Sequence, residues 1–239
     1  MDASVNLSEE QKQRLRSNLS AIHQRMADAA QRGGRDPDAV RLVAVTKRTP
    51  LQVALALNDL GAAILAESRP EELCRKAQQI SVPLSWHLIG PFQTKKIAKT
   101  LPHTELVHSV HSIRLGRDIA ARVNRGGLKP QRILLQVNVC GEEAKQGLSP
   151  THLESALEEL SCLDDLMVCG LMTMAPKGAS DIELREIFGA LHAMRDNLGA
   201  DRLPELSMGM SGDFEIAIEE GATLIRVGSA LFEGMVFDS

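Results

Sequence analysis

The chain has 239 residues, of which 44% are hydrophobic and 24% are charged, and its formal net charge is -4 at pH 7. This composition is sufficient for a complete buried core, and it lacks the basic excess that nucleic-acid backbones and anionic membranes attract. Nucleic acid and membranes are therefore not expected as partners, and the length favours one domain over residues 1–239.

The first residues, 1–19, are polar and lack the apolar centre of a signal peptide. No later segment approaches the roughly 18 apolar residues of a membrane span. The cysteines are scattered, with no C-x-x-C pair, which indicates reduced thiols and no metal site. They are Cys74, Cys140, Cys162 and Cys169. We therefore expect a cytoplasmic protein.

Residues 7–33 predict one long amphipathic helix at the start of the chain. Ser8 is followed by acidic residues, as is typical of a helix N-terminus, and Gly33 with Gly34 is a typical stop signal. This helix is expected to form a lid or a flank of the domain that follows.

From residue 41 to residue 234, short apolar segments alternate with helical ones. The predicted strands are 41–46, 62–67, 84–90, 104–109, 132–139, 166–172, 205–209 and 223–228. The predicted helices are 51–60, 71–79, 94–100, 112–124, 151–160, 181–198 and 213–220. Because these strands are apolar on both faces, they should form a parallel sheet covered by helices.

This alternation predicts the α/β class and a single (β/α)8 TIM barrel with an extra N-terminal helix. An open, doubly wound sheet is the alternative. In such a sheet a glycine-rich turn binds a dinucleotide after the first strand, whereas this chain reads VTKRTP there. The sequence therefore favours the closed barrel.

Chemistry in this fold gathers at the C-terminal ends of the strands, and Lys47 lies at such an end. It directly follows the apolar segment LVAV, so its amine should reach the barrel mouth from a largely buried stem. Burial favours the neutral amine, which is the form that attacks aldehydes. The alternative is a lysine that extends from the strand end into solvent.

Two loops predict an anion site. The segments SMGMSGD and RVGSALFEG place Ser211, Gly228 and Ser229 between a strand and a helix start, where backbone N–H groups can bind phosphate. The alternative is that the two serines only cap their helices.

Arg226 lies inside the apolar strand TLIRVG, where an unpaired guanidinium would be costly. It should therefore have a buried acceptor. A salt bridge to Glu67 or Glu215 would provide one, and so would the ring nitrogen or phosphate of a ligand.

A lysine, an arginine and a phosphate site at one barrel mouth suit a phosphorylated aldehyde. Pyridoxal 5′-phosphate (PLP) is such a molecule, and a phosphorylated sugar bound by a Schiff-base aldolase is another. Among the remaining residues, His87 is expected to be a hydrogen-bonded core residue and Lys145 a solvated loop lysine. Four methionines are expected to fill the core: Met172, Met174, Met208 and Met210.

Five motifs between residues 41 and 234 resemble, in order, those of the pyridoxal phosphate homeostasis proteins, which are relatives of the alanine racemase N-terminal barrel. They are LVAVTKRTP, WHLIGPFQTKK, VNVCGEEAKQG, GLMTMAP and LSMGMSGDFEIAIEEGATLIRVGSALFEG. The resemblance implies a PLP barrel of fold type III over residues 41–234, with the helix at 7–33 beside it.

The resemblance also implies roles for single residues. Lys47 would form a Schiff base with PLP, and Arg226 would face the pyridine nitrogen. The phosphate and its surroundings would be held by Ser211, Gly228, Ser229 and Met210. An arginine at the ring nitrogen keeps that nitrogen unprotonated and weakens PLP as an electron sink. The chain departs from the residues common in this family over residues 65–69, where only Glu67 is retained and Ser68 replaces an asparagine, and also at Lys95 and Cys140.

The implied function is intracellular PLP (vitamin B6) homeostasis, in which the chain holds PLP without robust catalysis and passes it to PLP-dependent apo-enzymes. A weak or specialised amino-acid racemase is the alternative. Two-base racemisation needs a second base, and this chain contains no tyrosine. It also leaves no room after the last strand for the second domain through which racemases build a shared site, so we expect a monomer.

Overall fold

The computed structural model of the chain describes residues 7–80, 82, 84–142 and 146–237. Parallel strands close into a barrel in the order β1 to β8, with β8 paired to β1. The strands are β1 (Arg41–Val45), β2 (Ile64–Glu67), β3 (Ser85–Leu88), β4 (Leu106–Val110), β5 (Gln131–Gln136), β6 (Leu166–Met172), β7 (Glu205–Ser207) and β8 (Leu224–Val227). All eight predicted strands are confirmed, and the open-sheet alternative is wrong.

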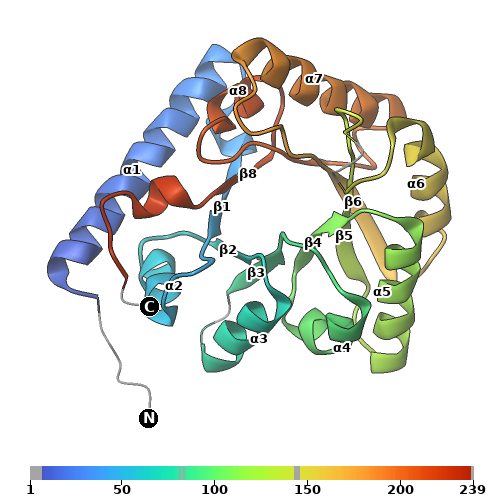
Figure 1. Cartoon of the computed structure of the whole chain (residues 1–239), viewed down its shortest axis with the longest axis horizontal. Helices are drawn as coiled ribbons and strands as arrows, with labels where there is room; N and C mark the ends of the chain where they lie inside the picture. Colours follow the sequence, from blue (N-terminus) through green and yellow to red (C-terminus); the bar gives the residue numbers. More distant parts are fainter. Residues whose placement is uncertain (1–6, 81, 83, 143–145, 238–239) are drawn as a thin grey trace.

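Helices surround this ring (Figure 1). They are α1 (Glu9–Arg32), α2 (Leu51–Asp59), α3 (Pro70–Gln79), α4 (Ile97–Thr100), α5 (Ile113–Gly126), α6 (Leu153–Ser161), α7 (Asp181–Leu198) and α8 (Phe214–Glu219). The helix predicted over 94–100 is divided into a 3₁₀ turn, Thr94–Lys96, and the short α4. A further 3₁₀ turn, Ser229–Phe232, follows β8.

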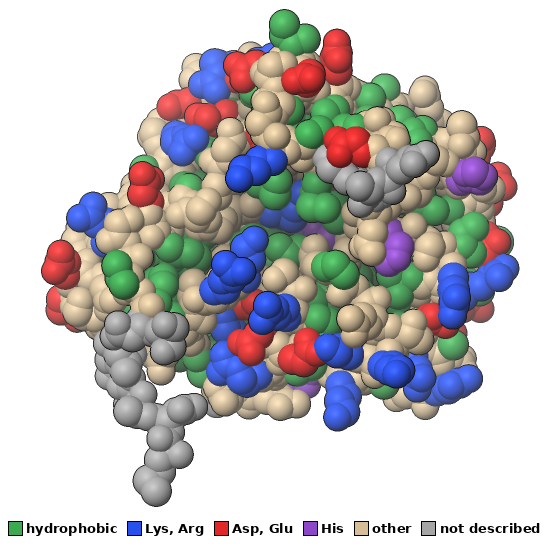
Figure 2. All heavy atoms as spheres, viewed as in Figure 1, with side chains coloured by type: hydrophobic (Ala, Val, Ile, Leu, Met, Phe, Trp, Pro, Cys, Tyr) green, Lys and Arg blue, Asp and Glu red, His purple; other side chains and the backbone are tan. Residues whose placement is uncertain are grey.

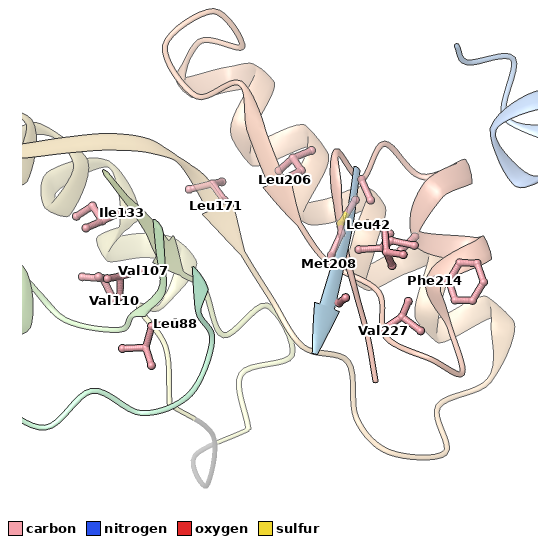
Figure 3. Packing of buried hydrophobic residues seen from close by; sticks show 14 of the residues in the cluster. Leu42, Leu88, Val107, Val110, Ile133, Leu171, Leu206, Met208, Phe214 and Val227 are labelled. Carbon is pink, nitrogen blue, oxygen red and sulfur yellow. The ribbon is translucent and has the colours of Figure 1, made fainter. Parts of the chain in front are cut away.

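The apolar strands bury both of their faces, which is why they read as continuous apolar segments. Inside the ring, Val43 and Val45 pack with Ala66 and Leu224. The alternate residues face the helices and form a larger outer layer, part of which is drawn in Figure 3. This inward and outward alternation decides which residues after each strand can face the barrel mouth.

The N-terminal helix α1 is a flank of the barrel and not a lid. Ser8 and Gln11 form a capping box at its start. Its apolar face is buried, and α1 lies beside α8 and the C-terminal segment (Figure 1). Arg25 of α1 binds both carboxylate oxygens of Glu215 at 3.2 and 3.0 Å, and the Asn18 side-chain amide donates to the carbonyl of Leu231 at 3.0 Å.

Within the described ranges, no helix has the length and apolar character needed to cross a membrane. Nor do three His, Cys, Asp or Glu side chains of these ranges gather as metal ligands would.

Candidate functional site

Lys47 lies in a turn at the C-terminal end of β1. The Thr49 N–H donates to the Thr46 carbonyl at 3.2 Å and closes the turn. Val43 and Val45, which lie four and two residues before Lys47, belong to the cluster inside the ring. Lys47 itself is exposed, so the expectation of a largely buried stem is wrong.

The residue after Lys47 has a backbone conformation that L-amino acids avoid. Arg48 has a φ of 63° and is the one non-glycine residue in the described chain with a positive φ. A Cβ in this left-handed region costs on the order of 1 kcal/mol. The turn that presents Lys47 is therefore strained and must be held by its surroundings.

We expect Arg48→Gly to stabilise the fold by about 0.5 to 1 kcal/mol, because glycine relieves the strain and loses part of the gain through its greater freedom when unfolded. Arg48→Ala is the matched control, since it removes the charge and keeps the Cβ. Urea unfolding would measure both. Equal midpoints for the glycine and alanine variants would show that the turn is not strained.

A buried ion pair stabilises the turn that contains Lys47 by binding Thr46, the residue before it. Lys76 of α3 and Glu67 of β2 are each 1% exposed, and the Lys76 amine donates to a Glu67 carboxylate oxygen at 2.6 Å. The same amine donates to the Thr46 carbonyl at 2.7 Å, and the Thr46 hydroxyl donates to Glu67 at 2.7 Å. Both polar groups of the residue before Lys47 are therefore fixed. Sequence reasoning missed Lys76, because a lysine on an amphipathic helix normally faces solvent.

The two loops of the expected phosphate site lie together. The Ser211 hydroxyl oxygen accepts hydrogen bonds from the Gly228 N–H at 3.2 Å and from the Ala230 N–H at 3.3 Å. This hydroxyl therefore lies against two backbone donors, which are the groups that bind anions in such loops. Ser211 joins the loops after β7 and β8 and accepts from the first turn of the 3₁₀ helix Ser229–Phe232, whereas the N-cap of α8 is Asp213.

Gly228 connects this site to the strand of Lys47. A Cβ placed on Gly228 would be 3.4 Å from both the Cβ and the carbonyl oxygen of Val45. Gly228 is also the N-cap of the 3₁₀ turn after β8 and has no side chain of its own to cap it. Ser229 is exposed at its start, so its hydroxyl is accessible from solvent. Neither serine is the N-cap of its own helix, because Asp213 and Gly228 occupy those positions, and the loop of Gly228 lies against β1.

Met210 lies at the mouth and is 37% exposed. Its backbone N–H donates to the Asp213 carboxylate, so that donor already has a partner. Its side chain lines a cavity of about 380 Å³, together with Ser109, Gln136 and Met174 from the ends of other strands. Met172 and Met208 are buried as predicted, whereas the prediction of core packing is wrong for Met174 and Met210.

Arg226 is buried inside the ring and is 4% exposed. Its Nη1 donates to the Ser207 hydroxyl at 2.6 Å, and its Nη2 donates to the Thr173 carbonyl at 3.0 Å. The two salt bridges considered from the sequence are not formed, because Glu67 binds Lys76 and Glu215 binds Arg25. Burial lowers the pKa of Arg226 to about 10, and the charge of Asp213 offsets only part of this effect. The guanidinium remains charged at neutral pH.

Two histidines continue this polar arrangement inside the barrel. His87 is 3% exposed and hydrogen-bonded, as predicted for a core histidine, and its partner is His108 at 2.9 Å. Burial, with repulsion from Arg132 and Arg41, lowers the pKa of His87 to about 3. Burial also lowers the pKa of His108 well below its usual range. Sequence reasoning missed His108, although it alternates with the inward-facing Leu106 in β4.

These lowered pKa values predict acid sensitivity. Both histidines stay neutral in the fold while the unfolded chain takes up protons below pH 6.5, so stability should fall from pH 6.5 down to about 3. The expected slope is about 1.4 kcal/mol per pH unit for each histidine. Urea unfolding at several pH values would measure it. His108→Asn should make the slope shallower, and an unchanged slope in that variant would contradict the assignment.

Other sequence-predicted residues lie outside this group or outside the described ranges. Lys95 is exposed and lines a groove of about 880 Å³ between α3 and α4 together with Lys96 and Lys99. Figure 2 shows Lys and Arg side chains gathered over this part of the surface. Ser68 follows β2 and approaches Gly90 through its backbone. Lys145 lies outside the described residues.

The comparisons with known proteins agree with this geometry. The family described as alanine racemase, N-terminal domain, matches residues 14–235. The pyridoxal phosphate homeostasis protein of Aquifex aeolicus is 36% identical over 218 residues, which are 90% of this chain and 95% of that protein. The protein of the same name from Pseudomonas aeruginosa is 38% identical over 227 residues, 90% of this chain and 93% of the other.

Solved structures give the same result. The structure of PipY from Synechococcus elongatus with PLP bound has a TM-score of 0.79 and 30% identity, and the match covers 91% of this chain and 99% of that one. A Clostridium difficile alanine racemase has a TM-score of 0.74 at 16% identity, covering 92% of this chain and 56% of that one, which supports the fold alone. The chain therefore belongs to the alanine racemase N-terminal domain family and, within it, to the pyridoxal phosphate homeostasis proteins.

Proposed function

We propose that this chain binds PLP covalently through Lys47 at the barrel mouth and serves in intracellular PLP homeostasis. One observation carries the proposal: the Ser211 hydroxyl joins the Gly228 and Ala230 amides in a loop that lies against Val45, two residues before Lys47. This proximity supports a lysine and an anion-binding loop acting at one mouth. The PLP-bound structure of PipY, at 30% identity, supports the same ligand.

The residues present fit the parts of PLP. The phosphate would be held by the hydroxyl protons of Ser211 and Ser229, and by the Gly228 and Ala230 N–H groups if they exchange the Ser211 oxygen, which they now bind, for a phosphate oxygen. Met210 lies at the edge of this mouth. The charged, buried Arg226 would face the pyridine nitrogen. When bound, PLP supplies an aldehyde that a lysine amine can hold.

The proposed activity is storage and delivery to PLP-dependent apo-enzymes, without robust catalysis. An arginine at the pyridine nitrogen cannot give up its proton to the ring, which limits carbanion chemistry. The chain also has no tyrosine, which is the residue that would act as the second base in two-base racemisation. We infer that the protein works in the cytoplasm as a single-domain monomer. A weak or specialised amino-acid racemase is the second candidate.

The test combines attachment and transfer. The purified protein is incubated with PLP, reduced with borohydride, digested and examined by mass spectrometry, and the modified peptide should contain Lys47. The loaded protein, freed of excess PLP, should then activate a PLP-dependent apo-enzyme. Absence of any modified peptide would refute PLP attachment. A high racemase activity toward one amino acid in a panel would favour the second candidate over the carrier.

A further inference from the structure

A row of hydrogen-bonded side chains crosses the interior of the barrel. Arg226 of β8 donates to the Ser207 hydroxyl of β7 at 2.6 Å. The same hydroxyl is 2.8 Å from Nδ1 of His108 in β4, and Nε2 of His108 is 2.9 Å from Nδ1 of His87 in β3. All four residues are at most 4% exposed. The bond between Ser207 and His108 joins strands that are not neighbours in the ring.

The direction of every hydrogen bond in this row follows from the arginine and from the need of the Ser207 proton for an acceptor. A guanidinium can only donate, so the Ser207 oxygen must accept from it. A hydroxyl oxygen can accept a second hydrogen bond, but the described residues offer the Ser207 proton no acceptor other than Nδ1 of His108, so that nitrogen must be unprotonated to accept it. His108 therefore carries its proton on Nε2 and donates to Nδ1 of His87. His87 in turn carries its own proton on Nε2, and both rings are neutral.

Neutral partners leave the charge of Arg226 available. Within the described part of the chain, no carboxylate lies within salt-bridge distance of this guanidinium, and its two hydrogen bonds go to a hydroxyl and a carbonyl. A carboxylate would neutralise the arginine and compete with an electron-rich ligand atom. A hydroxyl held by a neutral histidine fixes the orientation of the guanidinium. It neither neutralises the arginine nor competes with the ligand.

We propose that His108, acting through Ser207, is a positioning residue that orients the Arg226 guanidinium for the ligand at the barrel mouth, and that His87 selects the tautomer of His108 that this role needs. The inference rests on the proposed function, because the ligand that Arg226 meets is PLP. It adds two strands, β3 and β4, to a site whose other residues come from β1, β7 and β8.

The first test needs no ligand. Nitrogen-15 NMR of the ligand-free, full-length protein at pH 7 reports the protonated nitrogen of each histidine ring. His87 and His108 should both be neutral tautomers with the proton on Nε2. A proton on Nδ1 of either ring, or a charged ring, would overturn the proposal, because the Ser207 hydroxyl would then lose its acceptor.

The second test uses variants of His108. His108→Phe keeps a planar ring and removes the acceptor of the Ser207 proton. The dissociation constant for PLP should then rise about tenfold, which is the effect of losing one hydrogen bond in a group that includes a charged residue. The visible absorption of the bound PLP should also shift. His108→Asn offers an acceptor near the position of Nδ1 and should recover most of the affinity. His103→Phe, on the opposite side of the barrel from the mouth, is the matched control.

A second variant keeps the test decisive if the phenylalanine ring does not fit. Ser207→Ala removes the bridging oxygen without adding volume and should weaken PLP binding and shift the absorption in the same direction. Wild-type affinity and an unshifted band in this variant would overturn the positioning role while leaving the proposed function intact. A wild-type protein that attaches no PLP would instead overturn the proposed function. The NMR measurement of the His87 and His108 tautomers would still test the hydrogen-bonded row in that case.

Discussion

Lys47→Ala is expected to abolish covalent PLP attachment completely. The wild-type protein with PLP should absorb in the violet, as PLP bound to a lysine does, and borohydride should make the attachment permanent. The variant retains the phosphate loop of Ser211 and Gly228, so it should still bind PLP weakly and release it on gel filtration. The visible spectrum and the intact mass after reduction measure the two effects.

Two further variants make this result specific to the amine of Lys47. Lys47→Arg keeps a positive charge at the mouth and cannot bond the aldehyde, so it should lose attachment as fully as alanine does. Lys95→Ala removes an exposed lysine from the α3 and α4 groove and should attach PLP normally. Full attachment in Lys47→Ala, with the modification found on another lysine, would contradict the role of Lys47.

Lys76→Met is expected to produce the largest loss of stability, on the order of 3 to 5 kcal/mol. It leaves the Glu67 carboxylate buried without its cation, and removing one partner of a buried ion pair has this cost. It also releases the Thr46 carbonyl, which the Lys76 amine binds at 2.7 Å, so the turn of Lys47 should loosen and PLP attachment should slow. Urea unfolding and the rate of PLP uptake measure the two consequences.

The neighbouring residue on the same helix provides the control. Arg75 forms an ion pair with Glu72 in which both side chains are more than a third exposed, so Arg75→Met should change stability by less than about 1 kcal/mol. The double variant Lys76→Met with Glu67→Leu removes both charges and should recover much of the loss. If Lys76→Met unfolds at the same urea concentration as Arg75→Met, the buried pair does not support the turn.

The strands and most helices could be predicted because each depends on a local pattern. Segments such as LVAV at β1 are apolar on both faces, and only a parallel sheet covered by helices buries them in that form. The helix over 94–100 was only partly predictable. Its sequence has no N-cap side chain, and the structure begins it as a 3₁₀ turn before the short α4.

Residues of the site could be found from the sequence where they break the local pattern. Lys47 follows an apolar strand directly, Arg226 interrupts another, and small residues surround Ser211. Each is unusual for its position. Because the C-terminal ends of all strands in a (β/α)8 barrel lie at one mouth, these residues are expected to be close together. The sequence left open whether Lys47 is buried or extends into solvent, and the structure shows it exposed, in the turn that continues through Arg48.

The sequence by itself determined the eight-unit barrel and the flanking helix, since these follow from spacing along the chain, and it identified Lys47, Arg226 and the loops after β7 and β8 as candidates. Only the tertiary structure decided the partners that hold them. His108 is hydrogen-bonded to Ser207, 99 residues further along the chain, and Lys76 contacts Glu67 from the buried face of α3 that also holds Leu73. Such pairs form because closure of the ring brings distant strands within hydrogen-bond distance. Sequence periodicity predicts single helices and strands, and it does not predict which side chains of distant strands meet.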